Sequence, residues 1–140
     1  MNESYLFRGK GKHTGKWITG SLICSNEGRY ISYGGWGLAT ISFCSHKDEI
    51  RVLVEEVDPA TIGQCTGLRD KGGKLIFEGD ILTRIGRNVK RRYVVEWNMY
   101  YWALNDNRIE SSLLMNAGDL HDQVIIGNRW DNPELLKEAE

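Results

Sequence analysis

The chain has 140 residues, of which 41% are hydrophobic, and it carries 18 Lys or Arg against 19 Asp or Glu. This length fits one domain, which can bury a core without a metal or disulfide framework. The net charge of −1 excludes general long-range attraction to nucleic acid or membranes, so such a partner would have to meet a local patch.

Cysteine usage and hydropathy indicate the compartment. Cys24, Cys44 and Cys65 are odd in number and form no C-x-x-C pair. Cys44 and His46 have no second closely spaced pair beside them, so we expect neither a metal site nor a cofactor. No signal-like apolar run opens the chain, and no stretch approaches the ~20 apolar residues of a membrane span. We therefore expect a reduced, cytoplasmic protein without membrane contact.

The first part of the chain predicts strands separated by turns. Sixteen glycines and two prolines favour many turns in a mainly β chain. A basic, glycine-rich stretch at 9–16 leads into a strand over 17–23. Two short strands are expected within 29–44, on either side of glycines at 34–37. β-Branched residues predict a further strand over 50–57.

A single helical turn is predicted next. Asp58 can cap it with its carboxylate, and Pro59 at the first helical position loses no needed N–H. Gly63 is expected to end it.

The middle of the chain again alternates turns and strands. Asp70 and the glycines that follow it predict a turn, because an aspartate can bond the amides ahead of it. Strands are expected over 74–78 and 81–85, with Gly79 turning the chain between them.

Aromatic strands follow a basic loop. Alternation predicts that Tyr93, Val95 and Trp97 share one strand face and point into the core. Further strands are expected over 99–104 and 123–127.

Two helices are considered toward the C-terminus. Residues 109–120 are also compatible with a helix. A short C-terminal helix is predicted by three residues: Asn132 as its cap, Pro133 at its first position and Glu134 in its first turn.

A long central run carries a family resemblance. Residues 57–82 read VDPATIGQCTGLRDKGGKLIFEGDIL, which resembles the YopX family pattern D-P-x-T-[VI]-G-Q-[YF]-T-G-L-x-D-x-x-G-x-x-I-[YF]-E-G-D-I. Flanking pieces, FRGKGKHTGKWITGSL and VIIGNRWDNPELL, are also similar to the family. Cys65 departs from the pattern, where an aromatic residue is usual. The resemblance implies a phage or prophage protein with a mainly β fold, and it brings no established reaction or ligand.

The fold expectation combines both lines of argument. A Gly-Asp turn, a strand, a basic loop and two aromatic strands follow one another as in a small SH3-like barrel. We therefore expect a mainly β, YopX-like single domain over 1–140, with an SH3-like small-barrel portion and a short C-terminal helix.

The first candidate site is a polar cleft. Its residues are Thr61, Gln64, Asp70, Glu78 and Asp80. The carboxylates of Glu78 and Asp80 could bind Mg²⁺ or divide acid and base work in a metal-dependent enzyme. The favoured alternative is structural: Asp70 and Asp80 bond turn amides, Gly79 supplies a positive φ, and Glu78 faces solvent.

The second candidate site is a basic loop that no acidic residue interrupts. It contains five of the 18 cations, namely Arg84, Arg87, Lys90, Arg91 and Arg92. Tyr100 and Trp102 follow it as candidate stacking rings, a combination typical of single-stranded nucleic-acid binding. The alternative is a solvated hairpin loop, since blocks of like charge are usually exposed faces.

A third feature points to assembly. The run NMYYWAL at 98–104 is longer than one barrel face can bury, and surplus apolar surface often marks a subunit interface. The sequence thus predicts a non-enzymatic binding or assembly module. A homo-oligomer is one hypothesis for its partner, and nucleic-acid binding and a metal-dependent enzyme are the alternatives.

Overall fold

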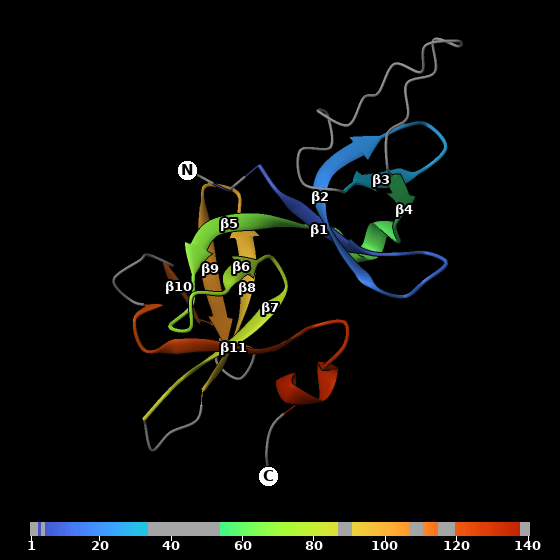
Figure 1. Ribbon diagram of the computed structural model, residues 1–140. Coiled ribbons are helices and arrows are strands. Elements are labelled where there is room, and N and C mark those ends of the chain that lie inside the picture. Colours follow the sequence, from blue (N-terminus) through green and yellow to red (C-terminus); the bar gives the residue numbers. More distant parts are fainter. Residues whose placement is uncertain are drawn as a thin grey trace, which may run out of the picture. The chain divides into compact units, whose positions relative to one another are not determined.

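The computed structural model describes residues 3, 5–33, 54–86, 91–106, 111–114 and 120–137, with only the backbone at 111–114 (Figure 1). The described chain is mainly β and antiparallel, which confirms the expected fold class. It divides into two compact units, a first unit of Ser4–Gln64 and a second unit of Cys65–Glu140 with Met1–Glu3. The interpretation of residues 1–140 as one domain stays a prediction.

The first unit is an antiparallel sheet with its strands in chain order. β1 (Phe7–Lys10), β2 (Trp17–Cys24), β3 (Arg29–Ser32) and β4 (Val54–Glu56) pair in succession. An isolated bridge joins Gly11 to Val57. β1 also pairs with the first residues of β5 (Gly63–Arg69), the strand along which the chain enters the second unit.

The core of the first unit contains Ile31 and Val57, both essentially buried. Gly9 lies against Val57, and a Cβ at this position would come within 3.0 Å of the valine Cβ. The predicted helical turn is confirmed as η1 (Pro59–Thr61), in which Asp58 Oδ1 accepts a hydrogen bond from Ala60 N at 3.0 Å.

The second unit contains a hairpin and a five-stranded sheet. The last residues of β5 pair with β6 (Leu75–Phe77). The order of the sheet is β10-β9-β8-β7-β11. Its strands are β7 (Asp80–Arg84), β8 (Arg92–Asn98), β9 (Tyr101–Asp106), β10 (Ser111–Leu114) and β11 (Gln123–Asn128).

A cluster of buried residues in the second unit lies on one face of this sheet. Its buried residues are Ile76, Leu82, Tyr93, Val95, Leu104 and Leu120, with Leu68, Trp102 and Ile125 packed against them. The predicted alternation is therefore confirmed for Tyr93 and Val95. It is wrong for Trp97, which is 50% exposed, because β8 continues past the edge of the core.

Other expectations fail or are only partly met. Within the described part of the chain, no strand pairing closes the five-stranded sheet into a barrel, so the SH3-like portion is not confirmed. The helix considered over 109–120 is wrong at Ser111–Leu114, which pair with β9. The C-terminal segment contains one 3-10 helix, η3 (Pro133–Leu136), and the Asn132 side chain does not cap it.

Several expected features fall on residues that the structure does not describe. They are the glycines at 34–37, the second strand within 29–44, the start of the strand at 50–57, and Cys44 with His46. Among the described residues, no helix is long and apolar enough to cross a membrane.

Candidate functional site

Asp70 joins the turn after β5 to the outer edge of β11. Its Oδ1 accepts a hydrogen bond from Lys74 N at 2.9 Å, and its Oδ2 accepts one from Ile125 N at 3.1 Å. Lys71 N donates to Gln123 O at 2.8 Å in the same place. The expectation that Asp70 bonds its own turn is confirmed, and the bond to β11 adds a long-range role. An edge strand leaves amides unpaired, and this carboxylate satisfies one of them.

The Glu-Gly-Asp turn is built around a tryptophan. Gly79 has a φ of +90°, and a Cβ at this position would overlap the Trp130 ring. Gly79 N donates to Val95 O at 2.8 Å, and Gly79 O accepts from Arg129 N at 2.9 Å. Asp80 is 2% exposed, and its Oδ2 accepts from Phe77 N at 2.8 Å. The expected positive φ and the expected aspartate–amide bond are both confirmed.

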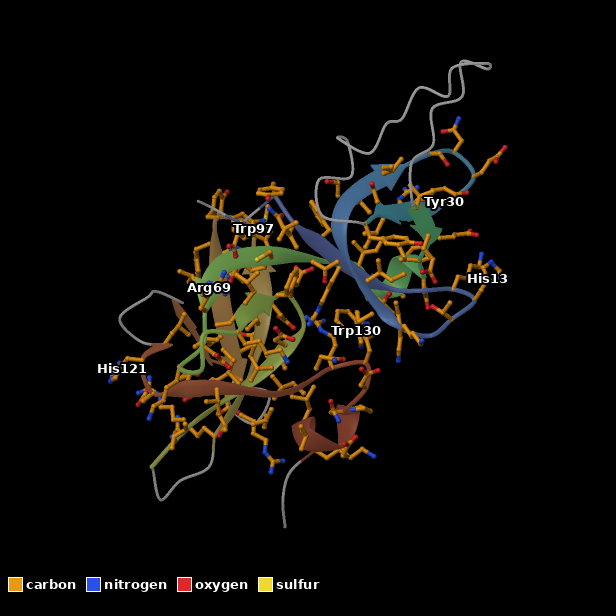
Figure 2. All side chains as sticks on the ribbon, viewed as in Figure 1. His13, Tyr30, Arg69, Trp97, His121 and Trp130 are labelled. Carbon is orange, nitrogen blue, oxygen red and sulfur yellow. The ribbon has the colours of Figure 1, made fainter. Side chains whose placement is uncertain are left out.

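An asparagine loop holds Trp130 in place. Asn128 Oδ1 accepts from Trp130 N at 3.1 Å and from Asp131 N at 2.9 Å. Asn132 Oδ1 accepts from Asn128 N at 3.2 Å, so these side chains satisfy backbone amides at the end of β11 and in the loop after it. Trp130, labelled in Figure 2, is a residue that sequence reasoning missed. Its only sequence signal was its place in the GNRWDNPEL landmark.

The predicted polar cleft does not form as one site within either unit. Thr61 and Gln64 belong to the first unit, and Asp70, Glu78 and Asp80 to the second. Thr61 is buried, where its Oγ1 donates to Asp58 O at 2.7 Å and accepts from Lys10 N at 2.8 Å.

The other two members of this set differ in exposure. Gln64 is exposed at the end of the β1–β5 pairing, whereas Glu78 is half-buried and does not face solvent fully as expected.

The described part of the chain offers no set of metal ligands. Among the residues that the structure describes, no group of three or more His, Cys, Asp or Glu is placed to hold a metal ion. Asp80, half of the pair considered for Mg²⁺, already accepts a backbone N–H and is buried. Geometry thus favours the structural interpretation of the central motif.

Cys65 is buried where the family pattern has an aromatic residue. It is 0% exposed, and burial raises the pKa of its thiol above the ordinary 9.0. A thiol that stays protonated is a poor nucleophile. Cys65 is therefore a packing residue.

The basic loop is only partly a free cationic surface. Arg84 Nη1 lies 3.7 Å from Asp122 Oδ2, and Arg92 Nη1 donates to Leu135 O at 3.0 Å. Arg91 is exposed, while Arg87 and Lys90 lie outside the described residues. Two of the three described cations are thus engaged within the second unit.

The structure separates the loop from its candidate stacking rings. Arg92 begins β8, and Tyr100 lies in the turn after this strand ends. β8 has seven residues, which at ~3.3 Å per residue places its ends about 20 Å apart. Trp102 is half-buried and packs against the core. Among the described residues, Arg92 and Tyr100 therefore do not belong to one binding surface.

The turn between β8 and β9 displays large apolar side chains. Met99 is 75% exposed and Tyr100 is 85% exposed, next to the half-exposed Trp97. Trp97 meets Trp102 edge to face, with ring centroids 5.1 Å apart. Asn98 Nδ2 donates to the Tyr101 hydroxyl at 2.9 Å across the turn. We call Trp97, Met99 and Tyr100 the hairpin tip; Figure 2 labels Trp97.

Comparisons with known proteins agree with the sequence resemblance. A family model described as YopX protein matches residues 6–137. The crystal structure of protein EF1440 from Enterococcus faecalis matches with 18% sequence identity and a TM-score of 0.59, covering 94% of this chain and 96% of that chain. At this identity the likeness shows the fold alone. No curated protein matches the chain.

Proposed function

This chain belongs to the YopX family, and we propose that it is a non-enzymatic assembly module that pairs with a second copy of itself through the hairpin tip. We place it in the cytoplasm of a bacterial host, as its cysteine usage suggests, and the family resemblance implies that a phage or prophage encodes it. The exposure of the hairpin tip is the observation that carries the proposal.

Exposed aromatic residues at one tip favour a protein partner. Met99 and Tyr100 are the most exposed large apolar side chains among the described residues. Tyrosine, tryptophan and methionine are enriched at interfaces, where they bury much area with little loss of side-chain freedom. Trp97 and the Asn98–Tyr101 bond hold the tip in one conformation, which lowers the entropic penalty of binding.

Backbone strain at the tip also favours a binding role for this turn. Met99 has a φ of +52° and is the only non-glycine residue of the described chain in this region. Short hairpin turns ordinarily place glycine, asparagine or aspartate at such a position. A left-handed non-glycine residue costs about 1–2 kcal/mol, and such strain clusters at functional positions.

The composition of the tip favours a second copy of the chain. Residues 97–105 contain no charged side chain, so the segment offers nothing for a strongly charged partner to recognise. An apolar, uncharged surface is self-complementary, and a twofold dimer brings the same patch of both copies together.

Light scattering over a concentration series tests the assembly proposal. We expect the mass of the wild type to rise toward that of a dimer, and the double variant Met99→Ser/Tyr100→Ser to stay monomeric. Ile85→Ser is the matched control, since Ile85 is 45% exposed and lies beyond the other end of the sheet, just after β7. A wild type that stays monomeric would contradict the proposal, as would equal association of wild type and double variant.

A second candidate is single-stranded nucleic-acid binding by the basic loop. The supporting observation is Arg91, which is exposed in a segment with five cations and no acid. Arg91→Glu should then abolish salt-sensitive binding of a single strand, and unchanged binding would exclude this site. The separation of Arg92 from Tyr100 along β8 makes this candidate the weaker one.

A further inference from the structure

The hairpin tip presents a methionine side chain to solvent. Met99 is 75% exposed, next to the 85% exposed Tyr100 and near the half-exposed Trp97, which Figure 2 labels. Peroxides oxidise the thioether of methionine to a sulfoxide, which turns a flexible apolar side chain into a polar one. A peroxide in solution therefore has access to the Met99 side chain of the monomer.

The turn fixes the backbone of Met99 in a strained conformation. Its φ is +52°, and Tyr100 N donates to Asn98 O across it. A hydrogen bond from residue i+2 to residue i around a positive φ is typical of the classic γ-turn, which is rare and strained. Asn98 and Tyr101 pair at the base of this turn, and Asn98 Nδ2 donates to the Tyr101 hydroxyl at 2.9 Å. Met99 is thus held at the end of the hairpin.

The surroundings of Met99 suit a thioether better than a sulfoxide. Residues 97–105 contain no charged side chain, and the Asn98 amide already donates to the Tyr101 hydroxyl. A sulfoxide oxygen that is buried between two such tips loses its water and meets few hydrogen-bond donors, which opposes burial. A twofold dimer brings both copies of the tip together, so this penalty applies twice.

We propose that Met99 is an oxidation site that regulates self-association, an inference that rests on the proposed function of the hairpin tip. The Met99 sulfur takes one oxygen atom from a peroxide and loses two electrons, while the O–O bond breaks and the peroxide leaves as water or an alcohol. The sulfoxide form stays monomeric, and enzymatic reduction to the thioether restores assembly. Because the dimer covers Met99, oxidation proceeds through the monomer.

Cysteine oxidation is the competing reaction that the experiment must separate. Cys24 is exposed and reacts with peroxide as well, whereas Cys65 is buried and its raised pKa keeps the thiol protonated. Each sample is therefore treated with dithiothreitol after the peroxide, which reduces cysteine sulfenic acids and disulfides but leaves the sulfoxide in place. Cys24→Ser is the matched control: Cys24 belongs to the first unit, so this variant should respond to peroxide like the wild type.

Sedimentation velocity on the full-length chain, before and after hydrogen peroxide, tests the proposal, with peptide mass spectrometry to locate the added oxygen. Oxidation at Met99 should raise the Kd of the dimer at least about 30-fold, as expected for one unpaired polar group per copy. Methionine sulfoxide reductase should restore the original Kd. Met99→Leu is compared only with itself, and its Kd should not change on treatment because leucine has no sulfur.

The rate of oxidation gives a second, independent measurement. In the wild type, oxidation of Met99 should slow as the protein concentration rises, because the dimer covers the side chain. Tyr100→Ser, which should impair association, is expected to be oxidised at the monomer rate at every concentration. Circular dichroism checks that each variant is folded. If Met99→Leu does not associate at all, this rate measurement and the reversal by the reductase decide.

The outcomes separate this proposal from the assembly proposal. A wild type that associates before treatment and equally well after full oxidation at Met99 would overturn the regulatory role alone. The same holds if Met99→Leu dissociates on treatment as the wild type does, if Cys24→Ser no longer responds to peroxide, or if the oxidation rate of an associating wild type is independent of concentration. A wild type that is monomeric before treatment would overturn both proposals.

Discussion

Gly79 shows how a single residue determines the structure of the central motif. Its positive φ, its two backbone hydrogen bonds and its close approach to Trp130 leave no space for a side chain. The motif that first suggested paired catalytic carboxylates is thus a turn on which an aromatic ring packs. Asp80 completes it by accepting the Phe77 amide.

Two glycine substitutions separate backbone strain from steric overlap. Gly73 has a φ of +86° but open space around it, so Gly73→Ala should cost only the left-handed penalty of about 1–2 kcal/mol. Gly79→Ala adds overlap with Trp130 and should cost about 2–5 kcal/mol in all. Urea denaturation measures both. If Gly79→Ala proves no more destabilising than Gly73→Ala, Trp130 does not pack on the turn as described.

Cys65 makes stability dependent on alkaline pH. Burial raises the pKa of its thiol in the folded state above the ordinary 9.0, so the unfolded chain releases this proton at a lower pH than the folded chain does. Its contribution to stability is therefore complete below the unfolded pKa and decreases as the pH rises through it.

The Cys65→Ala variant isolates this contribution. We expect the variant to be less stable than the wild type at neutral pH, because the side chain leaves a cavity. Between about pH 8 and about pH 10.5 its free energy of unfolding should fall less than that of the wild type. Urea denaturation at each pH measures this free energy. If it falls by the same amount in the two proteins, the pKa of Cys65 does not change on unfolding.

At the scale of elements, Asp70 connects a turn to a strand edge. Asp70→Ala should lower the free energy of unfolding by about 1–3 kcal/mol, since it leaves the amides of Lys74 and Ile125 without their acceptor. Hydrogen exchange should accelerate at Ile125 and leave the amides between β8 and β9 unchanged. Protection of Ile125 equal to that of the wild type would contradict this role.

In the β8–β9 hairpin, replacing Met99 by glycine should affect stability and self-association differently. Met99→Gly relieves about 1–2 kcal/mol of left-handed strain against the roughly 0.5–1 kcal/mol that glycine loses in backbone entropy. The monomer should thus be as stable as the wild type or slightly more stable, while self-association weakens. A marked loss of stability in urea denaturation would mean that the Met99 side chain packs within its own unit.

Local patterns predicted some elements and not others. The runs that became β2 and β8 are long and rich in β-branched or aromatic residues, so their strands were predicted within a residue or so of the observed ends. β1 and β5 were missed because glycine-rich sequences such as FRGK and GQCTGLR form strands here through their neighbours, not through their own propensity. β10 had a helical alternative because its strand depends on pairing with β9.

The candidate sites divide in the same way. The turn bonds of Asp70 and Asp80 are local and followed from residue type alone. The bond from Ile125 to Asp70 spans 55 residues, and the packing of Trp130 on Gly79 spans a similar distance, so neither could be predicted from spacing. Trp97 was misplaced because alternation gives the face of a strand but not where the core ends.

At the scale of the whole molecule, the structure favours surfaces over a reactive centre. The central motif is occupied by its own hydrogen bonds and by Trp130, while the second unit exposes an uncharged aromatic tip. Self-association through this uncharged tip should therefore not weaken steeply with salt.

Self-association through the hairpin tip can be measured by sedimentation velocity on the wild type, from about 5 to about 500 µM at about 50 and about 500 mM NaCl. Association through the hairpin tip predicts a concentration-dependent shift from monomer to dimer that persists at the higher salt concentration. A single monomeric species throughout, or a dimer that dissociates at high salt, would contradict it.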